Sequence, residues 1–512
     1  MNVLLVTLQQ TLDVMGLKYI HQYLLENGHR SVLLHLPRFR PENERDRLAV
    51  EAFVREVCPG LVGVSLMAVE HKGAKVLTAQ LRRALPGVPI VWGGIHPTTA
   101  PEVCLEHADY VCLGEGERAT LDMANALDHG ESLREVRNLC YRENGQVKAN
   151  PLHPLIKDLD ALPFPRQIPP NSFVLMDGRV EPTGPKALQR FMRYGTAVYN
   201  VVSSRGCPYR CAYCSNSCLH KLYPDWGIRR RSVSSVIAEL EQAVQDFPGL
   251  TYVNFQDDCF LACDMGYLAG MCHEFRSRIG KGIIAKSTPT YVTRERIALL
   301  KEAGLRWFNM GLQSGSERIC QDVYHRRSLP KHFLAAAQLL HEYGIAPWYD
   351  VIVDNPFETL EDHYETVETL MATPRPFYPQ IFSLTLYWGT DLRERAEREC
   401  PDEVGEPFES DFYVYHKRPI NDLIEVATTF PVPLTRRLLA VFKRNPTGLG
   451  TRLLVSLAKA YCRLVLRPIT YLRVIRVSQG GSLWKTFQIL PMYFRVGFSV
   501  YLGLFKSAFK RN

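Results

Sequence analysis

The chain has 512 residues, of which 46% are apolar and 22% are charged. This composition excludes a disordered or collagen-like protein, and the length predicts about three folded units. The net charge of +8 is uneven, because residues 426–512 carry fifteen Lys and Arg and no Asp or Glu. The first residues lack the pattern of a secretory signal, so we expect a cytoplasmic protein whose fourteen cysteines are thiols or metal ligands.

Residues 1–135 alternate short apolar runs with helical stretches. The runs at 2–6, 31–34, 61–65 and 88–92 predict strands buried on both faces, and residues 17–27 predict a helix that Gly28 ends. This pattern is typical of a doubly wound, flavodoxin- or Rossmann-like α/β domain with a parallel sheet. Ligands of such sheets bind beyond the carboxyl ends of the strands.

Residues 136–192 are rich in proline and show no sustained apolar period, which predicts a linker on the surface. From 193 to 420 the alternation resumes on a longer repeat. Its predicted strands lie at 199–204, 252–256, 283–287, 307–311, 348–353 and 381–386. Six such units predict a full or partial TIM-like parallel barrel, a (β/α)6 arrangement if partial, with its catalytic groups at the carboxyl ends of the strands.

Three cysteines follow the first predicted barrel strand. Cys207, Cys211 and Cys214 form a CxxxCxxC pattern within eight residues. Thiolates are the usual ligands of iron–sulfur clusters, and three of them on a 4Fe-4S cluster leave one iron open to a substrate. The alternatives are three ordinary buried thiols, or a zinc site completed by Cys218 or His220.

This loop resembles the signature of the radical S-adenosylmethionine (radical SAM) superfamily. The resemblance implies that the three cysteines bind the cluster and that Tyr213 lies near the adenine. It also implies that the segment 255–260 meets the methionyl amino group, with the donor left open among Gln256, Asp257 and Asp258 because the familiar Gly-Gly-Glu is absent. Further expected S-adenosylmethionine contacts, at the ends of the third and fourth barrel strands, are Ser287, Gln313, Ser314, Gly315 and Glu317. Residues 355–359 resemble the segment after the fifth strand.

Two glycine-containing loops in the first domain resemble those of the cobalamin-binding domain that precedes the radical core in a large class of this superfamily. The implied cobalamin contacts are Ser65, Gly93, Gly94, His96, Gly114, Glu115, Gly116 and Glu117. The Asp-x-His-x-x-Gly motif whose histidine ligates cobalt is absent, since residues 13–16 read Asp-Val-Met-Gly. His96 is either a ligand or, as loop histidines more often are, a hydrogen-bonding residue. The domain could also be a degenerate one retained for packing.

The basic segment 421–512 is predicted to be helical, with Arg452, Lys459, Arg463 and Arg467 among leucines. One interpretation is an amphipathic surface that makes peripheral contact with the inner membrane surface through 426–512. The other is a cap whose apolar face covers the barrel and whose basic face is solvated. Nucleic-acid binding is not expected, because the aromatic residues lie within apolar runs.

The resemblance as a whole implies an enzyme with three cofactors: a 4Fe-4S cluster, S-adenosylmethionine and cobalamin. We expect a C-methyltransferase that generates a 5′-deoxyadenosyl radical and transfers methyl from methylcobalamin to an unactivated carbon. The alternatives are a cyclase or oxidoreductase without methyl transfer, and a non-catalytic iron–sulfur or cobalamin sensor. The expected partners are a small-molecule substrate and an electron donor of the flavodoxin or ferredoxin type. The basic, apolar carboxyl-terminal segment hints that the substrate is hydrophobic.

Overall fold

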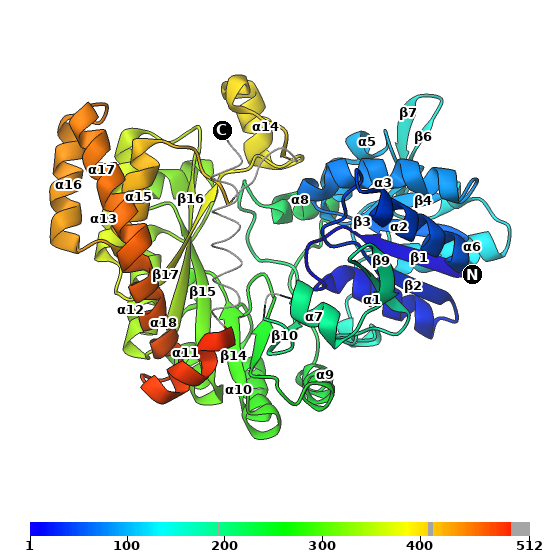
Figure 1. Ribbon diagram of the computed structural model, residues 1–512, viewed down its shortest axis with the longest axis horizontal. Coiled ribbons are helices and arrows are strands. Elements are labelled where there is room, and N and C mark those ends of the chain that lie inside the picture. Colours follow the sequence, from blue (N-terminus) through cyan, green and yellow to red (C-terminus); the bar gives the residue numbers. More distant parts are fainter. Residues whose placement is uncertain (193, 408–412, 493–512) are drawn as a thin grey trace.

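The chain forms two parallel-sheet domains, side by side, with a group of helices at the carboxyl end (Figure 1). The computed structural model describes residues 1–192, 194–407 and 413–492. The part of the predicted basic segment after Met492 lies outside the described residues.

The first domain is built on a nine-stranded sheet in the order β7-β6-β5-β4-β3-β1-β2-β8-β9. Its strands are β1 (Asn2–Thr7), β2 (Arg30–His35), β3 (Leu61–Ser65), β4 (Ile90–Gly93), β5 (Tyr110–Cys112), β6 (Leu139–Glu143), β7 (Gln146–Ala149), β8 (Ser172–Met176) and β9 (Arg179–Pro182). Its helices are α1 (Met15–Glu26), α2 (Glu44–Val57), α3 (His71–Ala84), α4 (Ile95–Thr99), α5 (Pro101–Cys104), α6 (Glu117–Asp128) and α7 (Pro185–Phe191). The central strands β1 to β5 and β8 pair in parallel.

Helices cover both faces of this sheet. Apolar side chains of α2 and α3, such as Val54 and Leu77, pack on one face, and those of α1 and α6, such as Leu24 and Met123, pack on the other. The strands are buried on both sides for this reason, which explains their almost unbroken apolar sequences. The predicted doubly wound α/β domain is confirmed.

The predicted linker 136–192 is wrong in one respect. Residues of this stretch form β6, β7, β8 and β9, which extend both edges of the first sheet. These strands are four or five residues long and mostly antiparallel, so each gives too little periodic pattern to stand out among prolines. The stretch therefore belongs structurally to the first domain.

The second domain contains a six-stranded parallel sheet in chain order, β10-β13-β14-β15-β16-β17. The strands are β10 (Val198–Val201), β13 (Tyr252–Phe255), β14 (Gly282–Lys286), β15 (Leu305–Gln313), β16 (Ala346–Val353) and β17 (Tyr378–Ser383). The helices are α8 (Ser215–Leu222), α9 (Val233–Asp246), α10 (Met265–Glu274), α11 (Arg294–Ala303), α12 (Pro330–Glu342), α13 (Leu360–Ala372) and α14 (Asp391–Glu399). Among the described residues β10 and β17 do not pair, so the barrel is partial, as predicted.

Local sequence signals start and stop several of these helices. The Ser232 hydroxyl accepts a hydrogen bond from the backbone N–H of Ser235 at the start of α9, and Thr293 does the same for Arg296 at the start of α11. Gly304 ends α11 with a φ of 112°, a conformation that a side chain disfavours.

Four helices follow the barrel: α15 (Pro419–Thr429), α16 (Val432–Arg444), α17 (Leu449–Tyr461) and α18 (Arg467–Ser478). Residues 483–492, the last described ones, are also helical. A π-helical turn, Cys462–Leu466, joins α17 to α18. Leu423 of α15 and Leu439 of α16 belong to the same apolar core as the barrel. No helix in the described part of the chain is both long enough and apolar enough to span a bilayer.

Candidate functional site

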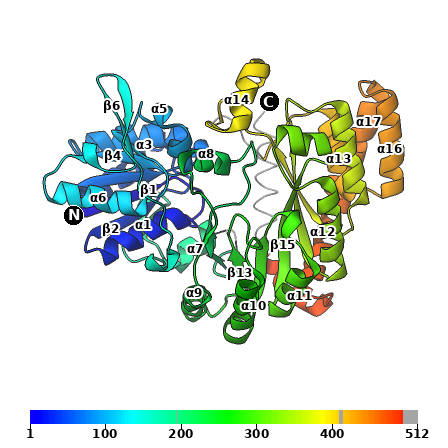
Figure 2. The same cartoon turned by 180° about the vertical axis from the view of Figure 1, so that it is seen from behind.

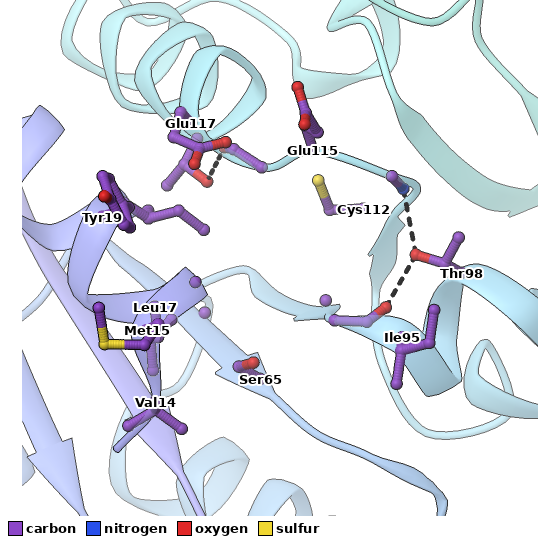
Figure 3. A pocket seen from close by; sticks show the side chains of 18 of the residues that line it. Val14, Met15, Leu17, Tyr19, Ser65, Ile95, Thr98, Cys112, Glu115 and Glu117 are labelled. Atoms are coloured by element: carbon purple, nitrogen blue, oxygen red, sulfur yellow. Dashed lines mark hydrogen bonds between the residues drawn. The ribbon is translucent and has the colours of Figure 1, made fainter. Parts of the chain in front are cut away.

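A pocket lies at the carboxyl ends of the first domain's strands, where the predicted cobalamin contacts meet (Figure 3). Seven of the eight predicted residues line it: Ser65, Gly93, Gly94, Gly114, Glu115, Gly116 and Glu117. One wall is apolar and includes Val14, Met15 and Leu17 at the start of α1. The sheet edge thus brings together residues that lie up to a hundred positions apart in sequence.

The two glycine loops approach each other closely. The Thr98 hydroxyl donates to the carbonyl oxygen of Gly94 at 2.8 Å and accepts from the backbone N–H of Gly114 at 3.1 Å (Figure 3). Both glycines have positive φ, and a Cβ on Gly114 would lie 2.1 Å from the hydroxyl of Tyr223. The loops therefore require glycine, and they leave bare backbone for a large flat ligand. Accessible glycine backbone and an apolar wall fit the corrin group that the resemblance implies.

His96 does not line this pocket. Its ring is buried, and its Nε2 lies 3.0 Å from Nδ1 of His71. Burial lowers the pKa of His96 to about 4, so the ring is neutral at physiological pH. Asp13, Val14, Met15 and Gly16, the stretch that lacks the cobalt-ligating histidine motif, line the pocket. None of the described residues that line the pocket is a histidine. A cobalt ion here would have no imidazole ligand from these residues.

The opposite wall of the pocket comes from the segment that carries the three cysteines. Val202, Arg205, Leu219 and Trp226 line it. Arg205, two positions before Cys207, donates through Nη2 to Glu117 at 2.6 Å. Arg229 pairs with Glu115 at 2.7 Å. Glu115 is half-buried, which favours a raised pKa, but Arg229 and Arg205 hold the pKa of its carboxyl below the usual value.

The same two arginines hold the start of the cysteine loop. Arg205 lies in β11 (Ser204–Arg205), which pairs antiparallel with β12 (Arg229–Arg230). The cofactor loop of the first domain and the cysteine loop of the second are therefore tied by one ion-pair network. This network could not be predicted from the sequence, because an isolated Arg and a Gly-Glu-Gly-Glu run do not indicate their partners.

The three cysteines are free thiols on one loop, and Cys207 and Cys211 are buried. Burial raises the pKa of Cys207 to about 12, and it also raises the pKa of Cys211 and Cys214. Bare thiolates are thus unfavourable here, whereas bound iron would supply the compensating positive charge. Backbone hydrogen bonds from Ala212 to Tyr324 and from Leu392 to Ala212 fix the loop against neighbouring elements.

The zinc alternative is not supported. The Nε2 of His220 lies 3.2 Å from the carbonyl oxygen of Cys207, and the Cys218 thiol faces the carbonyl oxygen of Trp388. Within the described part of the chain, no group of metal-binding atoms as compact as a zinc site includes the three cysteines, Cys218 or His220. The chain offers three cysteine ligands in this loop, which fits a cluster with one open iron.

Tyr213 and Arg326 flank the cysteine loop. The ring of Tyr213 packs edge-on against Tyr324, with centroids 4.8 Å apart, and its hydroxyl accepts from Nη1 of Arg326 at 3.2 Å. Arg326 is buried and also donates to the carbonyl oxygen of Gly311. Arg326 was not predicted from the sequence. Burial raises the pKa of Cys211, and the positive charge of Arg326 opposes part of this rise. Its position after a π-helical turn, Ile319–Val323, left no motif to recognise it by.

The structure separates the three candidates that follow the second barrel strand. Asp257 is buried and accepts hydrogen bonds from Ser203 and Ser204, so it holds the strand that leads to the cysteine loop. Asp258 accepts from Nδ2 of Asn216 at 3.2 Å, and the same nitrogen lies 3.8 Å from the sulfur of Cys214. Gln256 donates to Asn200 inside the barrel at 3.1 Å. Asp258 and Gln256 therefore remain as candidates for an S-adenosylmethionine contact.

The residues predicted from the third and fourth strands lie in different surroundings. Ser287 is buried 3.2 Å from the sulfur of Cys259. Gln313 has a φ of 69° and a side-chain oxygen without a partner among the described residues. Ser314 donates to Glu358, and Gly315 donates through its backbone N–H to Thr366. Glu317 is exposed and lies 3.7 Å from Lys331, so the structure does not bring it to the barrel interior.

Comparisons with known proteins agree with this geometry. Residues 201–370 match the family model of the radical SAM superfamily, and residues 1–124 match the B12 binding domain. The "Uncharacterized methyltransferase PH0819" of Pyrococcus horikoshii is 25% identical over 350 residues, which cover 68% of this chain and 71% of that protein. The "Anaerobic magnesium-protoporphyrin IX monomethyl ester cyclase" of Cereibacter sphaeroides is 24% identical, over 64% of this chain and 53% of the cyclase.

Solved structures show the same fold. The radical SAM methyltransferase TsrM from Kitasatospora setae, solved with tryptophan and an S-adenosylmethionine analogue, superposes with a TM-score of 0.61 at 18% identity, covering 77% of this chain and 76% of TsrM. The cobalamin-dependent radical enzyme OxsB, solved with aqua-cobalamin and S-adenosylmethionine, gives 0.63 at 15% identity and covers 98% of this chain and 81% of OxsB. At these identities the likeness establishes the fold alone. Independently of these structures, the two family models show that the chain is a radical SAM superfamily enzyme with an amino-terminal B12 binding domain.

Proposed function

We propose that this enzyme is a cobalamin-dependent radical SAM C-methyltransferase. The observation that carries the proposal is the shared wall between the two cofactor sites. The B12-binding pocket is closed on one side by Arg205 and Trp226, from the segment that holds Cys207, Cys211 and Cys214. A group carried on the cobalt would therefore lie beside the chamber where the cluster cleaves S-adenosylmethionine.

The chain's own residues supply position and exclusion of water in this proposal. The three cysteines hold the 4Fe-4S cluster, and Asp258 or Gln256 contacts S-adenosylmethionine. The bound cofactors supply the radical and the methyl group, and the protein orients them. We also propose a small-molecule substrate in the partial barrel and an external electron donor of the flavodoxin or ferredoxin type.

The test uses the full chain, reconstituted without oxygen with iron, sulfide and cobalamin. It is incubated with a reductant, S-adenosylmethionine bearing a deuterated methyl group, and a small-molecule extract of the source cells. Methyl transfer predicts both 5′-deoxyadenosine and S-adenosylhomocysteine, together with a product that carries the deuterated methyl. Release of 5′-deoxyadenosine without any labelled product would contradict methyl transfer.

A second candidate function is ring closure. Three of the similar proteins are named as anaerobic magnesium-protoporphyrin IX monomethyl ester cyclases. In that case the substrate would lose hydrogen and close a ring, and no label from S-adenosylmethionine would enter the product. The same incubation distinguishes the two functions by the mass of the product. If S-adenosylmethionine were never cleaved while both cofactors bound, the chain would instead be a sensor.

A further inference from the structure

The helical stretch from α17 to α18 presents its leucines to solvent. Leu449, Leu453, Leu457, Tyr461 and Leu464 follow one another at intervals of three or four residues, so they share one face of the helix. Their exposed fractions are 84%, 59%, 59%, 48% and 78%. Val465, Ile469 and Leu472 are exposed further along. We call this set of eight residues the leucine face.

Three cations of the same helical stretch pair with carboxylates of α15. Lys459 pairs with Asp422 of α15, and Arg463 pairs with Glu425 at 2.7 Å. Arg467 also reaches Glu425, at 3.2 Å. Glu425 is buried, yet Arg463 and Arg467 hold the pKa of its carboxyl below the usual value. These three cations therefore anchor the helices to α15, and Arg463 does so while its side chain stays 48% exposed to solvent.

The cap interpretation holds for α18 but not for α17. Val474 and Ile475 of α18 are buried against barrel residues that include Trp307 and Ala346, whereas α17 buries few apolar side chains, among them Val455. An apolar face of this length that is exposed to solvent indicates an interaction site, because single exposed leucines are common but a continuous row of them is not. The leucine face is therefore available to a partner.

The helix that carries most of the leucine face and its neighbour α16 are rich in exposed cations. Arg436, Arg437 and Arg444 lie on α16, Arg452 on α17 and Arg473 on α18, and all are exposed. No Asp or Glu follows Glu425 in the sequence, and Glu368 of α13 pairs with Lys443 of α16. A second copy of this chain would bring the same cations against these, and like charges oppose such pairing. An anionic lipid surface offers both an apolar interior for the leucines and phosphate charge for the arginines.

We propose that the leucine face docks the enzyme on an anionic lipid bilayer. The helices would lie in the plane of the interface, which agrees with the finding that no described helix is suited to span a membrane. In both views, α16 and α17 lie at the end of the molecule opposite the B12-binding domain (Figures 1 and 2). Docking there leaves the cofactor pocket away from the lipid. This inference does not depend on which reaction the enzyme catalyses.

The experiment is co-sedimentation of the full chain with vesicles of phosphatidylcholine, with or without phosphatidylserine. We expect binding to vesicles that contain phosphatidylserine at low salt, and weaker binding when salt screens the charges. The double variant Leu453→Ser, Leu464→Ser should bind at least about tenfold more weakly, because each leucine loses its apolar transfer energy. The matched control Leu48→Ser, Val76→Ser changes two exposed apolar residues on α2 and α3 and should bind like the wild type.

Three results would overturn the proposal. The first is a wild-type protein that fails to sediment with phosphatidylserine vesicles at low salt. The second is equal binding by the wild type and the Leu453, Leu464 variant. The third is a wild-type dimer in sedimentation velocity that this variant dissociates, which would assign the face to a second copy. Far-ultraviolet circular dichroism and the rate of S-adenosylmethionine cleavage should be the same in all three proteins, since the changed side chains are exposed and distant from the cofactors.

Discussion

Replacing Arg205 with Met would leave Glu117 buried without its cation. The carboxyl group of Glu117 is 2% exposed and receives a 2.6 Å hydrogen bond from Arg205, whose side chain is 17% exposed. Met keeps much of the apolar length of Arg, so the change removes the charge with little loss of packing. Glu115 would keep its bond to Arg229.

The expected cost follows from this burial. Removing one partner of a buried pair costs about 3–5 kcal/mol, whereas an exposed pair is worth about 0.2–1 kcal/mol. Because Arg205 keeps some contact with solvent, we expect the lower end, about 3 kcal/mol, for Arg205→Met. The paired variant Arg205→Met, Glu117→Gln should recover part of this loss, since no buried charge is then left unpaired.

The assay is urea unfolding of the full chain, followed by near-ultraviolet circular dichroism, with cobalamin affinity measured in parallel. Arg190→Met is the matched control, because Arg190 makes a two-bond pair with Asp177, at 2.6 and 2.8 Å, on the exposed surface. Because this pair is exposed, Arg190→Met should change the urea midpoint of the first unfolding transition very little. Arg205→Met should shift that transition clearly and weaken cobalamin binding, because Arg205 and Glu117 both line the pocket.

The reasoning would be refuted if Arg205→Met and Arg190→Met had the same effect on unfolding. It would also fail if the double variant lost as much stability as the sum of its two single changes, since the two side chains would then be independent.

Three further predictions concern the cofactor loops and the barrel. Cys211→Ala should abolish the cluster absorbance and the release of 5′-deoxyadenosine, whereas Cys58→Ala, at an exposed thiol, should leave both unchanged; activity in Cys211→Ala would disprove the cluster assignment. Thr98→Val should weaken cobalamin binding about tenfold by breaking the bridge between the glycine loops, as measured by equilibrium dialysis, and Thr99→Val, outside the pocket lining, should not. Burial raises the pKa of Asp350 to about 7. The folded state therefore holds this proton more tightly than the unfolded chain, so the wild type should lose stability relative to Asp350→Asn as pH rises from about 4 to 7 in urea titrations; a difference that does not change with pH would contradict the shift.

Much of the architecture was predictable because it depends on local pattern. Apolar runs of four to six residues at regular intervals indicated both parallel sheets, and capping residues such as Ser232 and Thr293 are local signals of helix starts. The three cysteines were recognisable for the same reason, since one short loop carries the whole ligand set. The pocket glycines could be predicted because their loops directly follow strands, and the carboxyl ends of parallel strands share one edge.

Other features depend on contacts that no local pattern encodes. His96 lies in the expected loop, but the packing of α3 turns its ring toward His71 and away from the pocket. Arg326 and Arg205 acquire their roles only when distant elements meet.

The carboxyl-terminal helices show this difference most clearly. Their sequence determined an amphipathic, basic segment, because the spacing of leucines and arginines fixes which side chains share a face. Which face turns inward was decided by the tertiary structure. Asp422 and Glu425 of α15 lie where they can pair with Lys459, Arg463 and Arg467, and a buried carboxylate requires such a partner. The leucines are left outside for that reason, where the sequence alone could equally have placed them within.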